Sequence, residues 1–289
     1  MQRNGGVRCD PGRPCCRYFS TNNTFAPPHL VGDLRFMFVR DPYSRLWSAY
    51  VDKFLLIDYW RTAGKAIVSL RKKKDNMTKC ARDISFKEFV EFVSTRQSSA
   101  GLNEHWKPIQ YQCSPCLYHP HVIGKIETFS QDSRYVLQLM NSSWILDSYD
   151  HEHHIYQEMS MLITYNFHVL KSSHYTNCTN ATDLSRRLWK TFQINGYLPM
   201  EMDFPDQGQA GINASRFQAL AFEAYRTRPS KSPAEWKEQR VKAMQDAFKD
   251  ISTETLQKIK NIYKIDFELF GYDPEPAFIF AGRKSSSKS

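Results

Sequence analysis

An apolar strand pattern runs directly into a helix pattern within residues 36–54, FMFVRDPYSRLWSAYVDKF. Residues 34–39 are mostly large and apolar, which predicts a buried β-strand. Asp41 suits the N-cap of a following helix, and Pro42 suits its first position. The helix then presents an apolar stripe, made of Tyr43, Leu46, Trp47, Tyr50 and Phe54.

Strand and helix patterns alternate further along the chain. Ser85-Phe-Lys-Glu88 predicts a capping box at the start of a second helix. Residues 121–128, HVIGKIET, predict a short strand that leads into another helix, and further helices are expected over residues 217–225, 236–248 and 256–263. This alternation predicts an α/β fold with a parallel sheet.

The chain is expected to form one compact domain over residues 34–280, since no long linker or internal repeat interrupts it. Residues 1–33 show no periodicity and are expected to be an irregular N-terminal segment. Residues 281–289 are expected to be a disordered tail, and His151-Glu-His-His154 an exposed loop. No apolar stretch reaches the roughly 18–20 residues that would span a bilayer.

The strand–helix junction has the chemistry of an anion site. Parallel sheets bind ligands at the carboxyl ends of their strands, and a helix N-terminus there favours a phosphate. Arg40 stands at the strand end, while Arg45 and Ser48 share one helical face. A guanidinium offers paired donors to phosphate oxygens, and a hydroxyl adds another. The alternative is an Arg40–Asp41 helix cap with a solvated Arg45.

Charge and sequons limit the partner and the compartment. The net charge of +9 and pI near 9.1 favour a polyanionic partner, which by charge alone includes nucleic acid, an acidic membrane surface and an acidic polysaccharide. No zinc finger, homeodomain or RNA-recognition motif supports nucleic acid. The sequence contains six Asn-X-Ser/Thr sequons, at Asn22, Asn76, Asn141, Asn177, Asn180 and Asn213. They favour a lumenal or extracellular protein, the alternative being a chance surplus.

The seven cysteines include a Cys113-Ser-Pro-Cys116 stretch near three histidines. That grouping is compatible with a zinc site. In a lumenal protein structural disulfides are favoured instead, with Cys80 or Cys178 as candidate partners. Spacing alone leaves the pairing open.

Three ordered blocks resemble the carbohydrate sulfotransferases that modify chondroitin, dermatan and related glycans. VRDPYSRLWSAYVDKF resembles their 3′-phosphate-binding motif, and residues 103–139 resemble their Asn-x-His-Trp, Cys-x-Pro-Cys and Val-x-Gly-Lys-x-Glu-Thr pattern. DFELFGY, residues 266–272, is similar to their C-terminal signature. Members of this family are Golgi enzymes that use 3′-phosphoadenylyl sulfate (PAPS), and the resemblance implies that Arg40 and Ser48 contact its 3′-phosphate.

The resemblance also implies a fold, a reaction and a location. The fold would be P-loop-like, with a central parallel sheet flanked by helices. The reaction would be in-line transfer of a sulfuryl group from PAPS to a glycan hydroxyl (chondroitin- or dermatan-like, or a terminal N-glycan sugar), with no metal. The acceptor would be an acidic glycan or proteoglycan, and no nucleic acid would bind. The protein would be a type II membrane protein of the Golgi lumen, anchored through a missing N-terminal segment.

Four features of the sequence are left open. The family's 5′-phosphosulfate loop has no match in residues 1–33, which predicts either a truncated start or a catalytically inactive glycan-binding relative. His105 is the remaining candidate for the base, the alternative being a histidine that packs beside Trp106. Lys125 and Glu127 either support the site or form a buried pair. Arg71-Lys-Lys-Lys74 is either a solvated face or the lining of a glycan groove.

Overall fold

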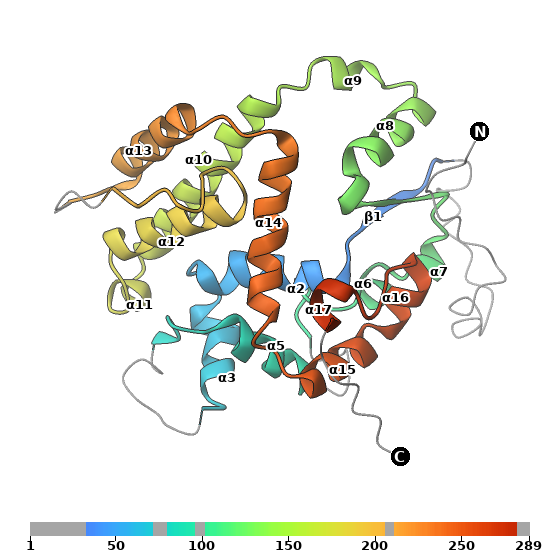
Figure 1. The fold of residues 1–289 in the computed structure, drawn as a ribbon, viewed down its shortest axis with the longest axis horizontal. Helices are drawn as coiled ribbons and strands as arrows, with labels where there is room; N and C mark the ends of the chain where they lie inside the picture. Colours follow the sequence, from blue (N-terminus) through green and yellow to red (C-terminus); the bar gives the residue numbers. More distant parts are fainter. Residues whose placement is uncertain (1–32, 72–79, 96–101, 206–210, 282–289) are drawn as a thin grey trace. The chain divides into compact units, whose positions relative to one another are not determined.

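A computed structural model gives the structure of the protein and describes residues 33–71, 80–95, 102–205 and 211–281. The described residues are mostly helical, with one two-stranded parallel sheet (Figure 1). The chain divides into two compact units: residues 1–46, 93–149 and 252–289 form unit 1, and residues 47–92 and 150–251 form unit 2. The domain expected over residues 34–280 includes parts of both. The predicted segment 1–33 lies, except for Asp33, outside the described residues, and so does the tail beyond Ala281.

Unit 1 contains the sheet. β1 (Phe36–Val39) pairs in parallel with β2 (Val122–Lys125), in a register that runs from Phe36 opposite Val122 to Val39 opposite Lys125. Its helices are α6 (Ile109–Cys113), α7 (Pro115–Tyr118), α8 (Phe129–Leu139), α9 (Trp144–Asp147), α15 (Thr253–Ile262), α16 (Lys264–Phe270) and α17 (Ala277–Phe280). A 3-10 turn, Ile126–Thr128, joins β2 to α8.

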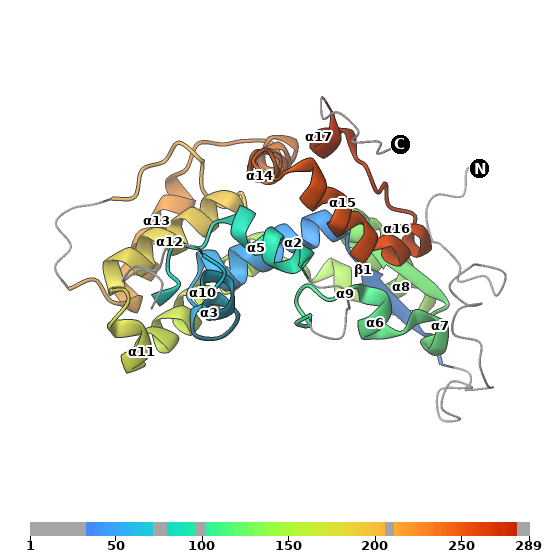
Figure 2. The same ribbon diagram turned by 90° about the horizontal axis from the view of Figure 1, so that it is seen from below.

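The core of unit 1 joins segments that are far apart in the sequence. One buried cluster brings together β1, β2, α6 and α16 through Val39, Ile109, Ile123, Leu269 and Phe270. Helix α16 packs against α6, and the two lie next to each other in both views (Figures 1 and 2). The C-terminal helices therefore complete the core around the sheet that the earlier segments build.

Helix α2 (Pro42–Tyr50) continues from β1, and its last turn, from Trp47 on, belongs to unit 2. The further helical segments are the π-helical turns Val51–Leu55 and Trp60–Gly64, α3 (Lys65–Val68), α5 (Phe86–Ser94), α10 (His151–Leu170), α11 (Ser173–Thr176), α12 (Ala181–Ile194), α13 (Ala214–Thr227) and α14 (Pro233–Phe248). Helix α10 packs against both α12 and α13. Among the described residues no helix is both long and apolar enough to cross a membrane.

Local capping explains several helix starts. The capping box predicted at Ser85 is confirmed, because Ser85 N–H donates to Glu88 Oε2 at 2.9 Å and Glu88 N–H donates to Ser85 Oγ at 3.2 Å. The loop expected at residues 151–154 is wrong: these residues form the exposed first turn of α10. Asp150 caps that helix by accepting the N–H of His153 at 3.1 Å, which stabilises a helical turn despite its polar sequence.

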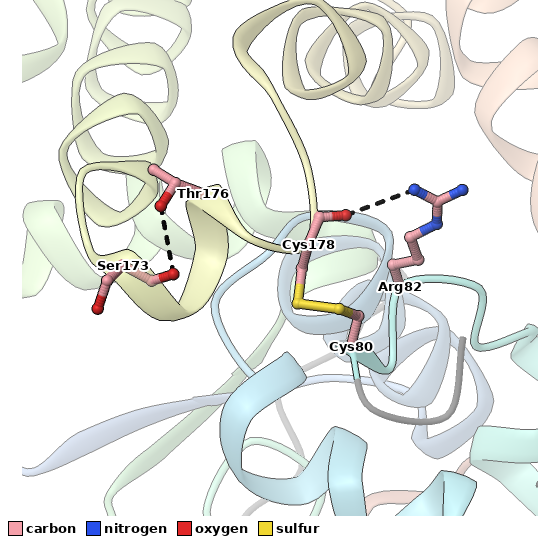
Figure 3. The surroundings of a disulfide bond; sticks show 5 residues. All are labelled: Cys80, Arg82, Ser173, Thr176 and Cys178. Atoms are coloured by element: carbon pink, nitrogen blue, oxygen red, sulfur yellow. Dashed lines mark hydrogen bonds between the residues drawn. A yellow bond between two sulfur atoms is a disulfide. The ribbon is translucent and has the colours of Figure 1, made fainter. Parts of the chain in front are cut away.

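A disulfide in unit 2 joins Cys80 to Cys178, 98 residues away in the chain (Figure 3). This bond does not involve the Cys-x-x-Cys stretch. Cys116 is also disulfide-bonded, whereas Cys113 is a free, exposed thiol. Within the described ranges no group of three or more His, Cys, Asp or Glu is placed to hold a metal ion.

Candidate functional site

The strand–helix junction in unit 1 is built by local contacts. Val39 ends β1 and is 1% exposed, which fixes the strand end in the core. The predicted N-cap is confirmed, since Asp41 Oδ1 accepts the N–H of Ser44 at 2.8 Å and Pro42 is the first residue of α2. Arg40 lies between the strand and this cap. Because Asp41 occupies a free N–H of the first turn, an anion here depends mainly on side-chain donors.

Arg40 is positioned by the first turn of the helix. Its Nε donates to Ser44 Oγ at 2.9 Å, and within the described residues this is its one side-chain hydrogen bond. Burial lowers the pKa of Arg40, while the nearby carboxylates of Glu127 and Asp41 act in the opposite direction. The terminal nitrogens of the guanidinium therefore remain as donors for an anion, in an orientation set by Ser44.

Ser44 is a candidate site residue that the sequence analysis did not single out. It lies four residues before Ser48, so the two hydroxyls share a face of α2. The i, i+4 spacing of Arg40, Ser44 and Ser48 was visible in the sequence and is the signal that could have identified Ser44. The cofactor roles of Arg40 and Ser48 stay predictions.

Arg45 holds a neighbouring loop. Its guanidinium donates to the carbonyl of Lys107, to the carbonyl of Glu104 at 2.7 Å and to Gln112 Oε1 at 2.9 Å. These three acceptors take up much of its donor capacity. The cofactor role of Arg45 stays a prediction, but the observed contacts give it a structural role as well.

A carboxylate connects the junction to the C-terminal motif. Glu127 Oε1 accepts the backbone N–H of Asp41 at 2.9 Å, and its Oε2 accepts the hydroxyl of Tyr272, also at 2.9 Å. Lys125 Nζ lies 4.3 Å from the centre of the Tyr272 ring and donates to Gly271 O at 3.3 Å. Lys125 and Glu127 thus both contact Tyr272, which favours the support role over a simple buried pair. We call the Tyr272–Glu127–Asp41 chain of hydrogen bonds the C-terminal brace.

A second carboxylate holds the block that contains His105. Asp266, 2% exposed, accepts the N–H groups of Ile109 at 2.6 Å and of Gln110 at 3.0 Å, and thereby caps α6. The Tyr263 hydroxyl donates to the Trp106 carbonyl nearby. The three sequence blocks of the resemblance are therefore connected to one another in unit 1 by specific hydrogen bonds.

His105 lies in a turn and its side chain is 37% exposed. Its Nε2 is 3.8 Å from Glu104 Oε1, and its backbone N–H donates to Asn103 Oδ1 at 3.0 Å. The Glu104 carboxylate is therefore close enough to influence the orientation of the imidazole ring. Trp106 is 2% exposed, so the tryptophan and not the histidine anchors this turn. The base role of His105 stays a prediction.

The described sequons are accessible. Asn141, Asn177, Asn180 and Asn213 are exposed, while Asn22 and Asn76 lie outside the described residues. Two of the four also cap helices: the side chains of Asn180 and Asn213 accept backbone N–H groups at the starts of α12 and α13.

The buried carboxyl of Asp266 predicts a pH dependence of stability. Burial raises the pKa of Asp266 from about 4 to about 6. A carboxyl whose pKa rises on folding contributes its stabilisation below the unfolded pKa and loses it as the pH rises through the folded pKa. We therefore expect this group to lower the free energy of unfolding by about 3 kcal/mol between pH 4 and pH 7. Urea denaturation across this range measures the slope.

Asp266→Asn removes this titration, so the free energy of unfolding of the variant should fall less steeply as the pH rises. Burial also raises the pKa of Asp41 to about 6, so Asp41→Asn should reduce the pH slope in the same way. Asparagine caps helices as well as aspartate does, so this variant keeps the helix cap. An unchanged slope in the Asp266→Asn variant would contradict the assignment.

Comparisons with known proteins identify the family of the chain. Residues 17–193, more than half of the chain, match the family described as "Sulfotransferase family". Carbohydrate sulfotransferase 11 of Mus musculus is 36% identical over 126 residues, a match that covers 40% of this chain and 35% of that protein. Carbohydrate sulfotransferase 9 of Homo sapiens is 35% identical over 112 residues, covering 37% of this chain and 25% of that protein.

Carbohydrate sulfotransferase 14 of Mus musculus is 34% identical over 105 residues, covering 36% of this chain and 28% of that protein. The chain thus spans about a third or less of the length of these curated relatives. No solved structure matches the chain.

Proposed function

The chain belongs to the sulfotransferase family, and from that premise we propose that it transfers a sulfuryl group from PAPS to a hydroxyl of a glycan. The observation that carries the proposal is the junction itself, where Arg40 is oriented by Ser44 at the end of a parallel strand. The similar proteins named above are all carbohydrate sulfotransferases, which supports a glycan acceptor. The α/β fold expected from the sequence agrees with the parallel β1–β2 pair and the helices around it.

The residues at the junction fit a phosphate. Arg40 supplies terminal guanidinium donors, and Ser44 and Ser48 supply hydroxyls on one face of α2. The neighbouring carboxylates of Asp41 and Glu127 accept hydrogen bonds from the N–H of Ser44 and the hydroxyl of Tyr272, and no hydrogen bond joins either of them to Arg40 within the described residues. These side chains would hold the 3′-phosphate of PAPS, whose contribution when bound is an activated sulfuryl group.

The chain's own residues would act by positioning and by proton transfer. Arg40 would fix one end of the donor, which places its reactive end relative to an acceptor. His105, beside Glu104, is the proposed base that takes the proton from the sugar hydroxyl. The C-terminal brace keeps Asp41, and with it the first turn of α2, in place while this happens.

Direct labelling tests the proposal. The chain, secreted from eukaryotic cells, is incubated with radiolabelled PAPS and with desulfated chondroitin, desulfated dermatan or N-glycans. We expect label to appear on at least one glycan and to be lost in Arg40→Gln. A chain that binds glycans but labels none of them supports the inactive glycan-binding alternative instead.

We also propose that the protein resides in the Golgi lumen and is anchored there as a type II membrane protein. The Cys80–Cys178 disulfide and the four exposed sequon asparagines support an oxidising, lumenal compartment. Digestion of the cellular protein with an N-glycosidase should increase its electrophoretic mobility. An unchanged mobility would argue against passage through the secretory pathway.

A further inference from the structure

Unit 2 contains a pocket of about 450 Å³ that the proposed function does not use. Its wall has four cationic and two acidic side chains: Arg82, Arg186, Arg187, Lys190, Asp83 and Asp183. The cations outnumber the acids by two. A concave surface with such an excess concentrates anions more strongly than a flat one.

Both acids already have cationic partners. Asp83 accepts two hydrogen bonds from Arg71 Nη1, at 2.9 and 3.2 Å. Arg71 is not part of the pocket, and it also donates to Glu88 Oε1 at 2.6 Å, so Asp83 shares this cation. Asp183 pairs with Arg186 at 3.4 Å within α12. Asp183 is therefore matched by Arg186, and Asp83 in part by Arg71, so the positive excess of the wall comes from Arg82, Arg187 and Lys190.

Arg187 forms the fixed part of the wall. Its guanidinium donates to Leu55 O at 2.9 Å and to Arg82 O at 2.6 Å. It also lies 4.6 Å from the centre of the Trp60 ring. Lys190 is more available, because its described contact is with the weak acceptor Met200 Sδ at 3.2 Å and its side chain is exposed.

The disulfide holds together the two segments that form the pocket. Arg82 comes two residues after Cys80, and Thr179, which also lines the pocket, follows Cys178. Figure 3 shows Arg82 Nη1 reaching the carbonyl of Cys178, at 3.4 Å. Asp183, Arg186, Arg187 and Lys190 follow on one face of α12 at helical spacing. The cations are thus arranged before any ligand arrives, which lowers the entropic cost of binding.

We propose that this pocket binds the sulfate or carboxylate group of an acidic glycan. Guanidinium groups match the planar oxygen pairs of such anions, and the Leu55 side chain offers an apolar wall for a sugar ring. That the anion belongs to a glycan, and not to another polyanion, rests on the proposed function. The binding of the anion itself rests only on the pocket.

The test uses the intact chain and chondroitin oligosaccharides, either 4-sulfated or unsulfated, measured by calorimetry. Arg82→Gln/Lys190→Gln should bind the preferred oligosaccharide about tenfold more weakly, the effect of two modest ion pairs. Arg216→Gln/Lys171→Gln is the matched control, because it removes the same charge from exposed positions of unit 2 outside the pocket. Its affinity should equal that of the unchanged chain.

Comparing the two oligosaccharides identifies the group. A tenfold loss seen only with the sulfated oligosaccharide assigns the pocket to sulfate, and a loss with both assigns it to the carboxylate. Equal binding by the pocket variant and its control overturns the inference. Adenosine 3′,5′-bisphosphate is titrated into the same proteins, and its binding should be unchanged by the pocket substitutions. Failure to bind this nucleotide at all would count against the proposed function and leave the pocket result intact.

Discussion

Replacing Arg40 by glutamine should weaken the binding of adenosine 3′,5′-bisphosphate about 100-fold, with a comparable loss of sulfuryl transfer. The substitution removes charge-assisted hydrogen bonds to the phosphate and leaves a neutral side chain in a half-buried position. Losing one such partner of a bound phosphate costs about 2.7 kcal/mol, which corresponds to a factor of 100. Isothermal titration calorimetry with the nucleotide measures the change without requiring catalysis.

Three variants separate the roles at this position. Arg40→Lys keeps the charge but not the paired donors, so its affinity for the nucleotide should fall between that of the unchanged chain and that of Arg40→Gln. Ser44→Ala removes the hydroxyl that accepts from Arg40 Nε and should cause a smaller loss. Arg134→Gln, a change of an exposed arginine on α8, should have no effect. Nucleotide binding by Arg40→Gln at the unchanged affinity would show that the junction is not the phosphate site.

Removing the disulfide of unit 2 should strongly lower the stability of the protein. Cys80 and Cys178 are separated by 98 residues, and a cross-link of that length restricts the unfolded chain strongly. We expect Cys80→Ser/Cys178→Ser to lower the free energy of unfolding by about 4 kcal/mol. Guanidinium denaturation followed by tryptophan fluorescence measures the difference.

Cys113→Ser is the control for that experiment, because Cys113 is exposed and carries a free thiol. Its stability should match that of the unchanged chain. A double serine variant as stable as this control would mean that the cross-link does not restrict the unfolded state. The variant should also bind the acidic oligosaccharide more weakly, because the segments with Arg82 and Thr179 are no longer joined.

The features predicted best from the sequence are local. The strand before Arg40, the Asp41 cap and the Ser85 capping box each depend on residues within four positions of one another, so their chemistry is visible in a short window. The helical first turn at residues 151–154 was missed although the same kind of signal was present. Asp150 stands where an N-cap stands, but a run of polar residues obscured it.

The contacts that complete the candidate site are not local, and the sequence did not predict them. Tyr272 and Glu127 are 145 residues apart, and Asp266 and Ile109 are 157 apart. The resemblance marked the two blocks that contain these four residues without saying which side chains meet. Arg45 shows the same limit: its position on the helix suggested a ligand, but whether carbonyls of a distant loop engage it depends on tertiary packing.

The C-terminal brace has a consequence for how the protein is made. Tyr272 leaves the ribosome 145 residues after Glu127, and later still than Asp41, the two residues that it secures. The nascent polypeptide therefore exposes the Arg40 turn in an unsecured form until Tyr272 has been made. We expect chains released prematurely, even just before Tyr272, to be handled by the cell's quality-control machinery as unfinished proteins.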